Sequence, residues 1–400
     1  MPSLPSNPHT TLCSLHLGAL AMSDQSALDV LASHGVTCLL SSHGQVPLSS
    51  LENRSVCILF SANWCRPCRT FVPQLARLYE TVNAAGEHPL EILFVSSDHD
   101  EKAFDEHFRC MPWLAVPFDA SLHGRLNKHY RVHRIPSLVP LTSEEMPGHD
   151  ELIGMIEDYG AEAFPFTKKR LEELKLLDAS RREGGNLERL LAGEGRDCLL
   201  LSDGGAGRLP VPHLVGKTVG LYFGASWSPP CSDFTQQLKE AYAELKAAAR
   251  DQCFEVIFVS TDGNKEEFEA GTSSMPWPFI PYEDKSRKDL CRIFGIRRIP
   301  ALIIVGRDGR TASREGREMV SEYGAMGFPF TAERRREIEE ALREEGEKLG
   351  RREVKDARHE HALKPGMAKA YVCDSCKREG RFWALSCEDC NYDLHPTCLN

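Results

Sequence analysis

Residues 56–75 read VCILFSANWCRPCRTFVPQL, and this stretch decides the fold. Its first five residues form an apolar run with the length and composition of a buried strand. Apolar side chains then recur at helical spacing, which predicts a helix over 69–83. A pair of cysteines, Cys65 and Cys68, therefore stands where a strand gives way to a helix.

The position of this CxxC pair indicates its chemistry. A helix N-terminus carries unpaired backbone N–H groups and a partial positive charge, and both stabilise a thiolate. Arg66 adds positive charge, and Pro67 fits the first helical turn, where a missing N–H costs little. We predict that Cys65 is the nucleophile, reachable from solvent, and that Cys68 resolves the mixed disulfide. The alternative, half of a zinc site, lacks a nearby ligand pair of matching spacing.

A proline before a later strand completes the predicted site. Ile135 and Pro136 come directly before an apolar run at 137–141, and this X-Pro bond is a candidate cis peptide. If it packs against the CxxC pair, the neighbouring backbone can pair with an extended substrate. We expect supporting substrate contacts from Trp64, Arg66, Pro67, Ile135 and Pro136.

The chain contains an internal repeat. FVSSD at 94–98 returns as FVSTD at 258–262, and MPW at 111–113 returns at 275–277, 164 positions later in both cases. A period this long indicates duplicated domains rather than a solenoid. Each copy alternates strands and helices, which predicts an α/β fold with a central mixed sheet flanked by helices. Further strands are expected at 91–96, 219–223, 255–260 and 301–305, and further helices at 101–108 and 232–248.

The second copy has lost half of the cysteine pair. Its motif runs from Trp227 to Cys231, and Ser228 stands in the place of the nucleophile. A serine hydroxyl forms no stable disulfide, so this copy cannot run a two-cysteine cycle. Cys231 alone could become glutathionylated, but a buried inert thiol is the interpretation we favour. We expect the second copy to dock partners or to orient the first.

A cluster of cysteine and histidine closes the chain. Five of the fifteen cysteines lie in its last 28 residues. Four of them form two CxxC pairs, and the fifth follows a histidine at the same spacing. Thiolate and imidazole ligands at such spacing indicate structural zinc, and the alternative of two disulfides conflicts with a reducing compartment. One site would take Cys373, Cys376, His395 and Cys398. A second site would take His361, Cys387 and Cys390, with His359 as a candidate fourth ligand; otherwise that site is open or absent.

Composition excludes other classes of function. The net charge is −10, so we expect no nucleic-acid partner, and no apolar run is long enough to span a bilayer. The N-terminal segment has no basic start and no long apolar core, so we expect no secretory signal and a cytoplasmic or nuclear protein. The expected organisation is a flexible tail (1–25), a redox-active domain (26–180), a degenerate domain (181–345), a charged linker (346–358) and a zinc module (359–400).

Together, these motifs resemble the plant nucleoredoxin family. Residues 60–68 (FSANWCRPC) and 222–231 (YFGASWSPPC) are similar to the active-site segments of nucleoredoxins and tryparedoxins, and the tail is similar to the plant C1-like module. The resemblance implies two tandem thioredoxin-like domains and a zinc-stabilised module. It also implies an NAD(P)-linked protein-disulfide reductase that is recharged by an NADPH-dependent reductase of the thioredoxin-reductase type, with no tightly bound organic cofactor. Its substrates would be disulfide-containing proteins.

One position departs from the thioredoxin pattern. Ordinary thioredoxins carry a buried acid six residues before the first cysteine, and Leu59 stands there in this chain. The sequence therefore assigns no group to take the proton from Cys68. A competing function is a scaffold in which the redox pair gates partner binding by the second copy and the zinc module. Lipid binding by the module is disfavoured by its acidic run and its lack of an exposed apolar loop.

Overall fold

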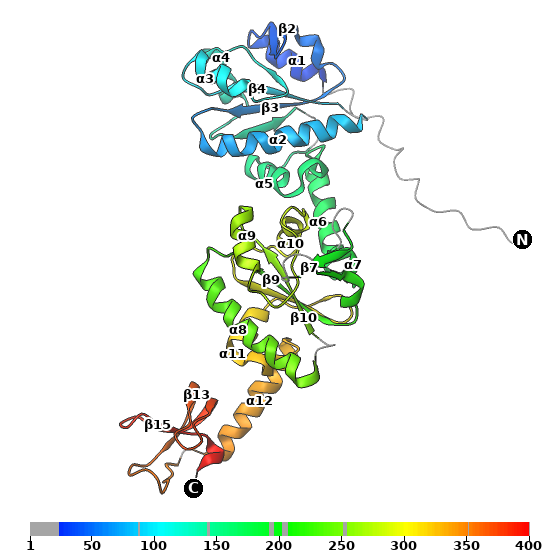
Figure 1. Cartoon of the computed structure of the whole chain (residues 1–400). Coiled ribbons are helices and arrows are strands. Elements are labelled where there is room, and N and C mark those ends of the chain that lie inside the picture. The colour runs from blue at the N-terminus through cyan, green and yellow to red at the C-terminus, as the bar shows by residue number, and fades with distance from the viewer. Residues whose placement is uncertain are drawn as a thin grey trace, which may run out of the picture. The chain divides into compact units, whose positions relative to one another are not determined.

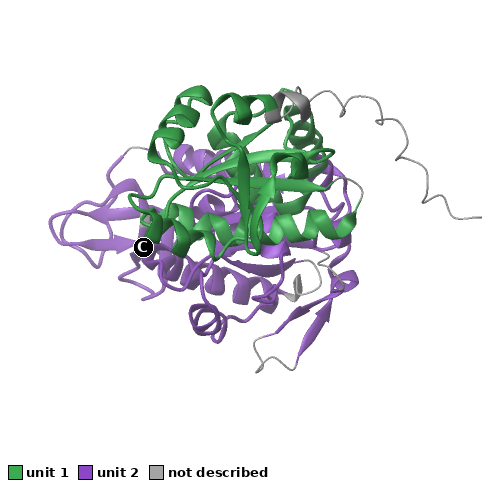
Figure 2. Cartoon of the chain, turned by 90° about the horizontal axis from the view of Figure 1, so that it is seen from above, with its two compact units in different colours: residues 1–178 green, residues 179–400 purple. Residues whose placement is uncertain are grey.

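The computed structural model describes residues 24–86, 89–141, 145–191, 196–201, 207–250, 254–350 and 352–399. The chain divides into two compact units, Met1–Asp178 and Ala179–Asn400, which Figure 2 shows in green and purple. The predicted N-terminal tail falls outside the described residues up to residue 23. Within the described ranges, no helix is both long enough and apolar enough to cross a bilayer.

The first unit alternates strands and helices, which confirms the predicted α/β class for this copy. Its strands are β1 (Cys38–Ser41), β2 (Gly44–Pro47), β3 (Ser55–Ser61), β4 (Leu90–Ser96), β5 (Leu114–Ala115) and β6 (Ser137–Pro140). Its helices are α1 (Asp24–Ser33), α2 (Arg66–Ala85), α3 (Glu101–Phe108), α4 (Ala120–His129), α5 (His149–Tyr159) and α6 (Lys168–Glu183), the last of which runs into the second unit.

A six-stranded mixed sheet in the order β2-β1-β5-β4-β3-β6 forms the centre of this unit. β3 is parallel to β4 and antiparallel to β6. Side chains alternate between the two faces of a strand, so Cys57 and Leu59 of β3 pack in the core with α2 and α5. Ile58 and Phe60 pack in the opposite core with α1 and α4, and Figure 1 shows these helix pairs on the two sides of the strands.

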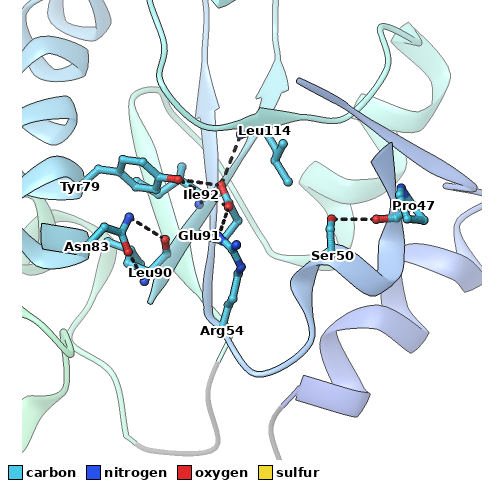
Figure 3. Close-up of polar contacts among 9 residues, drawn as sticks. All are labelled: Pro47, Ser50, Arg54, Tyr79, Asn83, Leu90, Glu91, Ile92 and Leu114. Carbon is cyan, nitrogen blue, oxygen red and sulfur yellow. Dashed lines mark hydrogen bonds and ion pairs between the residues drawn. The ribbon is translucent and has the colours of Figure 1, made fainter. Parts of the chain in front are cut away.

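A buried carboxylate network fixes the C-terminal end of α2 (Figure 3). Glu91 of β4 accepts hydrogen bonds from Arg54 Nη1 at 2.8 Å and from the Tyr79 hydroxyl at 3.4 Å. Burial raises the pKa of Glu91 above its ordinary value. The Asn83 side chain of α2 bonds both the N–H and the carbonyl of Leu90, at 2.8 and 3.0 Å. These contacts anchor α2 at one end and so hold its N-terminus at the end of β3.

The second unit repeats this plan and adds a C-terminal module. Its strands are β7 (Cys198–Leu200), β8 (Arg208–Pro210), β9 (Thr218–Gly224), β10 (Phe254–Ser260), β11 (Ala301–Val305), β12 (Thr311–Ser313), β13 (Lys364–Val372), β14 (Glu379–Cys387) and β15 (Tyr392–Leu394). Its helices are α7 (Leu187–Leu191), α8 (Pro229–Leu245), α9 (Lys265–Thr272), α10 (Ser286–Ile293), α11 (Gly316–Tyr323) and α12 (Ala332–Leu349).

The central strands of the second unit, β10-β9-β11, repeat the order β4-β3-β6 of the first, and β12 is added at the edge. β9 is parallel to β10 and antiparallel to β11, and β11 also pairs with β12. Single bridges from Phe279 to Leu200 and to Phe258 connect the β7–β8 hairpin to this sheet. Phe279 thus takes the place that β5 has in the first unit.

The C-terminal module is a three-stranded antiparallel sheet, β13-β14-β15. It contacts the preceding elements of the second unit through two aromatic side chains of β14. Trp383 Nε1 donates to the carbonyl of Leu342 in α12 at 2.7 Å, and the Phe382 ring stacks on Tyr323 at 5.9 Å. The predicted domain borders at 180/181 and 345/346 lie inside α6 and α12, and the domain ranges remain predictions.

Candidate redox site and metal-binding clusters

Cys65 occupies the N-cap of α2. Its backbone is extended (φ −82°, ψ 110°), and its Sγ accepts a hydrogen bond from the Cys68 N–H at 3.3 Å. The helix begins at Arg66, three residues earlier than the apolar spacing predicted, because the polar first turn is invisible to that pattern. A free backbone N–H is therefore aimed at the Cys65 sulfur, in the arrangement that stabilises a thiolate.

The two thiols differ in burial, which separates their chemistry. Cys65 keeps 6% of its surface exposed, whereas Cys68 has none. We expected Cys65 to be reachable from solvent, and the structure leaves only this small part of its surface accessible. Burial, and then the hydrogen bond with Cys65, raises the pKa of Cys68 to about 12. Cys68 therefore needs a neighbouring group that takes its proton.

The other predicted site residues surround Cys65. The Ile135–Pro136 peptide bond is cis, and the Ile135 carbonyl oxygen lies 3.7 Å from Cys65 Sγ. Trp64 is 56% exposed; its ring stacks on His99 at 5.9 Å, and its Nε1 donates to the Ser97 carbonyl. The side chains that complete this rim are also exposed, Arg66 and Pro67.

Two polar residues that the sequence analysis missed lie behind Cys68. Leu59 is fully buried, but the next side chain of β3 on the same face, Ser61, is a fully buried polar group. Its Oγ lies 2.9 Å from Nε2 of His107. The Ser61 hydroxyl also lowers the pKa of Cys68, against the larger effect of burial. Comparison of the two copies could have drawn attention to them, because glycine stands at both positions in the second copy.

The second copy keeps the backbone of the site without its chemistry. Ser228 caps α8 with nearly the same conformation (φ −96°, ψ 111°), but its side chain makes no capping bond. Cys231 is 1% exposed, as predicted for a buried thiol, and Trp227 is 62% exposed. Tyr222 stands at the place of Leu59, and its hydroxyl donates to the Cys231 carbonyl at 3.0 Å.

The first predicted metal cluster is assembled in the module. The ligand atoms of its four residues all lie within 4.8 Å of one another: Cys373, Cys376, His395 and Cys398. His395 Nε2 lies 3.2 Å from the Glu379 carbonyl, which leaves Nδ1, 3.3 Å from Cys376 Sγ, as the ligand nitrogen. Three thiolates and one imidazole suit tetrahedral zinc.

The second cluster resolves the open question of its fourth ligand. His359 joins the three predicted residues, and the four ligand atoms again lie within 4.8 Å: His359, His361, Cys387 and Cys390. The Nε2 atom of His359 is buried without a hydrogen-bond partner among the described residues, which fits a nitrogen reserved for a metal. Its ring stacks on Tyr392 at 4.3 Å, which fixes its direction.

Comparisons with known proteins agree with this geometry. A thioredoxin-like family model matches residues 53–145 and 216–311, and a C1 domain model matches 357–399. The chain is 54% identical to probable nucleoredoxin 3 of Arabidopsis thaliana over 370 residues, which cover 92% of this chain and 93% of that protein. It is 47% identical to probable nucleoredoxin 3 of Oryza sativa subsp. japonica, over 84% of this chain and 72% of that protein.

A solved structure of tryparedoxin II from C. fasciculata also matches. It is 35% identical over 36% of this chain and 97% of that protein, with a TM-score of 0.33.

Proposed function

Because this chain belongs to the nucleoredoxin family and is accordingly a thiol–disulfide oxidoreductase, we propose that it reduces disulfides of other proteins through Cys65 and Cys68. The observation that carries the proposal is the unequal placement of the two thiols. Cys65 caps the helix with 6% of its surface exposed, whereas Cys68 lies fully buried one turn behind it.

The cycle has two steps. The Cys65 thiolate attacks one sulfur of a substrate disulfide, forms a mixed disulfide and releases the first substrate thiol. Cys68 then loses its proton and attacks Cys65 Sγ, which forms the Cys65–Cys68 disulfide and releases the second thiol. The substrate gains two electrons, and the dithiol of the enzyme loses them. An NADPH-dependent reductase of the thioredoxin-reductase type would return the electrons.

The rim around Cys65 supplies the substrate contacts in this proposal. The backbone at Ile135 lies beside the attacking sulfur, where an extended substrate segment could pair with it. The exposed indole of Trp64 offers an apolar surface next to that segment. Zinc in the two Cys/His clusters would hold the C-terminal module folded, because so small a sheet has little core of its own.

Reduction of insulin disulfides tests this proposal. We expect wild-type protein with a dithiol donor to reduce insulin, and Cys65→Ser to lose activity to the uncatalysed level. Cys231→Ser is the matched control, because it removes the corresponding buried thiol of the second copy, and it should keep full activity. Equal turnover by wild type and Cys65→Ser would exclude the dithiol cycle.

A second candidate function concerns partner binding by the second copy. Its exposed Trp227 and its intact fold, without a nucleophile at Ser228, favour a docking role that the redox pair of the first copy would gate. Trapping with Cys68→Ser, which leaves clients on Cys65, discriminates between the two. Trp227→Ala should reduce the set of trapped proteins if the second copy recruits them.

We further propose a cytoplasmic or nuclear location, in keeping with reduced thiols.

A further inference from the structure

We infer that Ser61 and His107 form the path by which Cys68 loses its proton during resolution. The inference rests on the dithiol cycle proposed above and concerns its second step. Ser61 would accept the proton of the Cys68 thiol and pass its own to Nε2 of His107. This pair would take the role of the buried acid of ordinary thioredoxins, whose position Leu59 occupies in this chain without a polar side chain.

The fold directs both side chains towards Cys68. Ser61 follows Cys57 and Leu59 at every second position of β3, so it faces the core that contains α2. His107 lies three residues after Phe104 on α3, and Phe104 belongs to the same core. Ser61 is fully buried and His107 is 5% exposed, so their 2.9 Å contact lies away from solvent.

The surroundings of His107 keep its ring able to accept a proton. Burial lowers the pKa of His107, Asp98 acts in the opposite sense, and Arg69 of α2 adds to the lowering. The ring of Phe94 also lies close to His107, with its centroid 5.4 Å away. The imidazole is therefore neutral near pH 7, with Nε2 free to accept when Nδ1 carries the hydrogen.

The second copy supplies an internal comparison. There the nucleophile is replaced by Ser228, and the counterparts of Ser61 and His107 are Gly224 and Gly271. The space is closed by other groups: a Cβ on Gly224 would lie 2.9 Å from the Tyr222 hydroxyl, and one on Gly271 would lie 3.2 Å from Cβ of Ser226. The copy that cannot form a disulfide thus lacks both members of the pair, although it keeps Cys231.

The step balances as a proton transfer coupled to thiol–disulfide exchange. As Cys68 Sγ bonds to Cys65 Sγ, the bond between Cys65 and the substrate breaks. The Cys68 proton moves to Ser61 while the Ser61 proton moves to His107, and the departing substrate thiolate takes a proton from solvent. Ser61 is the catalytic residue, because its hydroxyl touches the reacting thiol. His107 is a positioning residue that acts through it.

A disulfide with two identical chromophoric halves, 5,5′-dithiobis(2-nitrobenzoate), separates the steps. Attack by Cys65 releases the first thionitrobenzoate, and resolution by Cys68 releases the second. Subtraction of the Cys65→Ser trace removes the signal of the other cysteines, and Cys68→Ser should lose the second phase. In His107→Gln and Ser61→Ala we expect the first phase to be unchanged and the second to slow by about 100-fold at pH 7. Ser61→Thr keeps the hydroxyl and should restore the rate.

The pH profile distinguishes a proton path from a structural role. In wild type the second phase should be level above pH 7 and fall as His107 becomes protonated. In His107→Gln it should rise about tenfold per pH unit through the alkaline range, because the buried thiol then ionises unaided. His123→Gln is the matched control, because His123 is partly buried and bonds a serine, Ser97, at 2.7 Å, yet lies outside the path.

The outcomes separate this inference from the proposed function. Wild-type resolution with equally fast second phases in His107→Gln and Ser61→Ala, across the whole pH range, would overturn the proton path alone. Absence of both phases in wild type would instead refute the dithiol cycle. Slowing of both phases together in either variant would assign these residues to the fold of the site and also overturn the inference.

Discussion

At the scale of single residues, the two copies differ where the chemistry differs. Leu59, Ser61 and His107 of the first copy correspond to Tyr222, Gly224 and Gly271 of the second. The surrounding backbone hardly changes, since Cys65 and Ser228 cap their helices with similar dihedral angles. In our proposal, the difference in catalytic capacity between the copies therefore depends on a few side chains that the same backbone can carry or lack.

The buried histidines make the stability of the first unit depend on pH. Burial lowers the pKa of His107 and of His123, so the unfolded chain binds protons that the folded chain does not. Their contribution is fully present above pH 6.5 and is lost as the pH falls towards the folded values. We expect the urea midpoint of the first unit to fall between pH 7.5 and 5.5, and to fall less in His107→Gln.

Alkylation of Cys57 measures this midpoint, because Cys57 is 2% exposed in β3 and reacts only when the first unit opens. His99→Gln serves as the control, since His99 is exposed, and it should leave the pH dependence unchanged. A His107→Gln protein with the full wild-type dependence would contradict the assignment.

The site could be predicted from the sequence only where a local pattern in the chain marks its residues. Cys65 and Cys68 form a local motif, and Pro136 is marked by the strand that follows it. Ser61 and His107 are 46 positions apart and meet only through the packing of α3 against β3. His359 was only a candidate ligand for the same reason, because its approach to Cys387 and Cys390 depends on the fold of the module.

At the scale of elements, a hydrogen-bonded aspartate after β4 joins this strand to the loop before α2. Asp98 accepts hydrogen bonds from the Asn63 N–H at 2.8 Å and from the Ser96 hydroxyl at 2.9 Å. Asp262 does the same in the second copy, with the Ser226 N–H at 2.8 Å and the Ser260 hydroxyl at 2.7 Å. Because the aspartate and its hydrogen bonds are also present in the copy without a nucleophile, they belong to the fold rather than to catalysis.

Removal of either aspartate should therefore destabilise its own unit. We expect Asp98→Ala and Asp262→Ala each to cost about 2–3 kcal/mol, because buried donors lose a charged acceptor. The midpoint for alkylation of Cys57 should fall in the first variant, and that of Cys231, which is 1% exposed, in the second. Each variant is the control for the other, and a shift of both midpoints by one substitution would contradict the prediction.

The elements themselves followed closely from the sequence pattern. Alternating apolar runs predicted β3, β4, β9 and β10 to within one or two residues, because both faces of these strands are buried. The short strands β1, β2, β7 and β8 were not predicted, since four or fewer half-exposed residues carry no periodic signal.

At the scale of the whole molecule, the chain combines two thioredoxin-like copies with a C1-like module that carries two clusters of metal-binding residues. The two core clusters around β9 and the two around β3 are built entirely from protein side chains. The module has only a small cluster of its own, in which the buried cysteines Cys373 and Cys387 take part. We therefore expect its stability to rest on zinc to a degree that the copies do not share.

Chelation should separate these parts. We expect removal of zinc to unfold the module, because structural zinc contributes about 10–16 kcal/mol of binding energy to such folds. Its five cysteines should then become alkylated, while Cys57 and Cys231 stay protected and insulin reduction continues. Mass spectrometry of the alkylated peptides gives the result. Loss of reductase activity on chelation, with Cys57 still protected, would contradict this independence.

The fluorescence of the exposed Trp64 should report the redox state of Cys65. The indole lies one residue before the attacking sulfur, and sulfur quenches tryptophan emission according to its oxidation state. Trp227 occupies the same place beside a hydroxyl that cannot be oxidised in this way, so its light should stay constant. A change in total tryptophan emission on oxidation can therefore be assigned to Trp64, and the fraction of oxidised enzyme can be followed without a label.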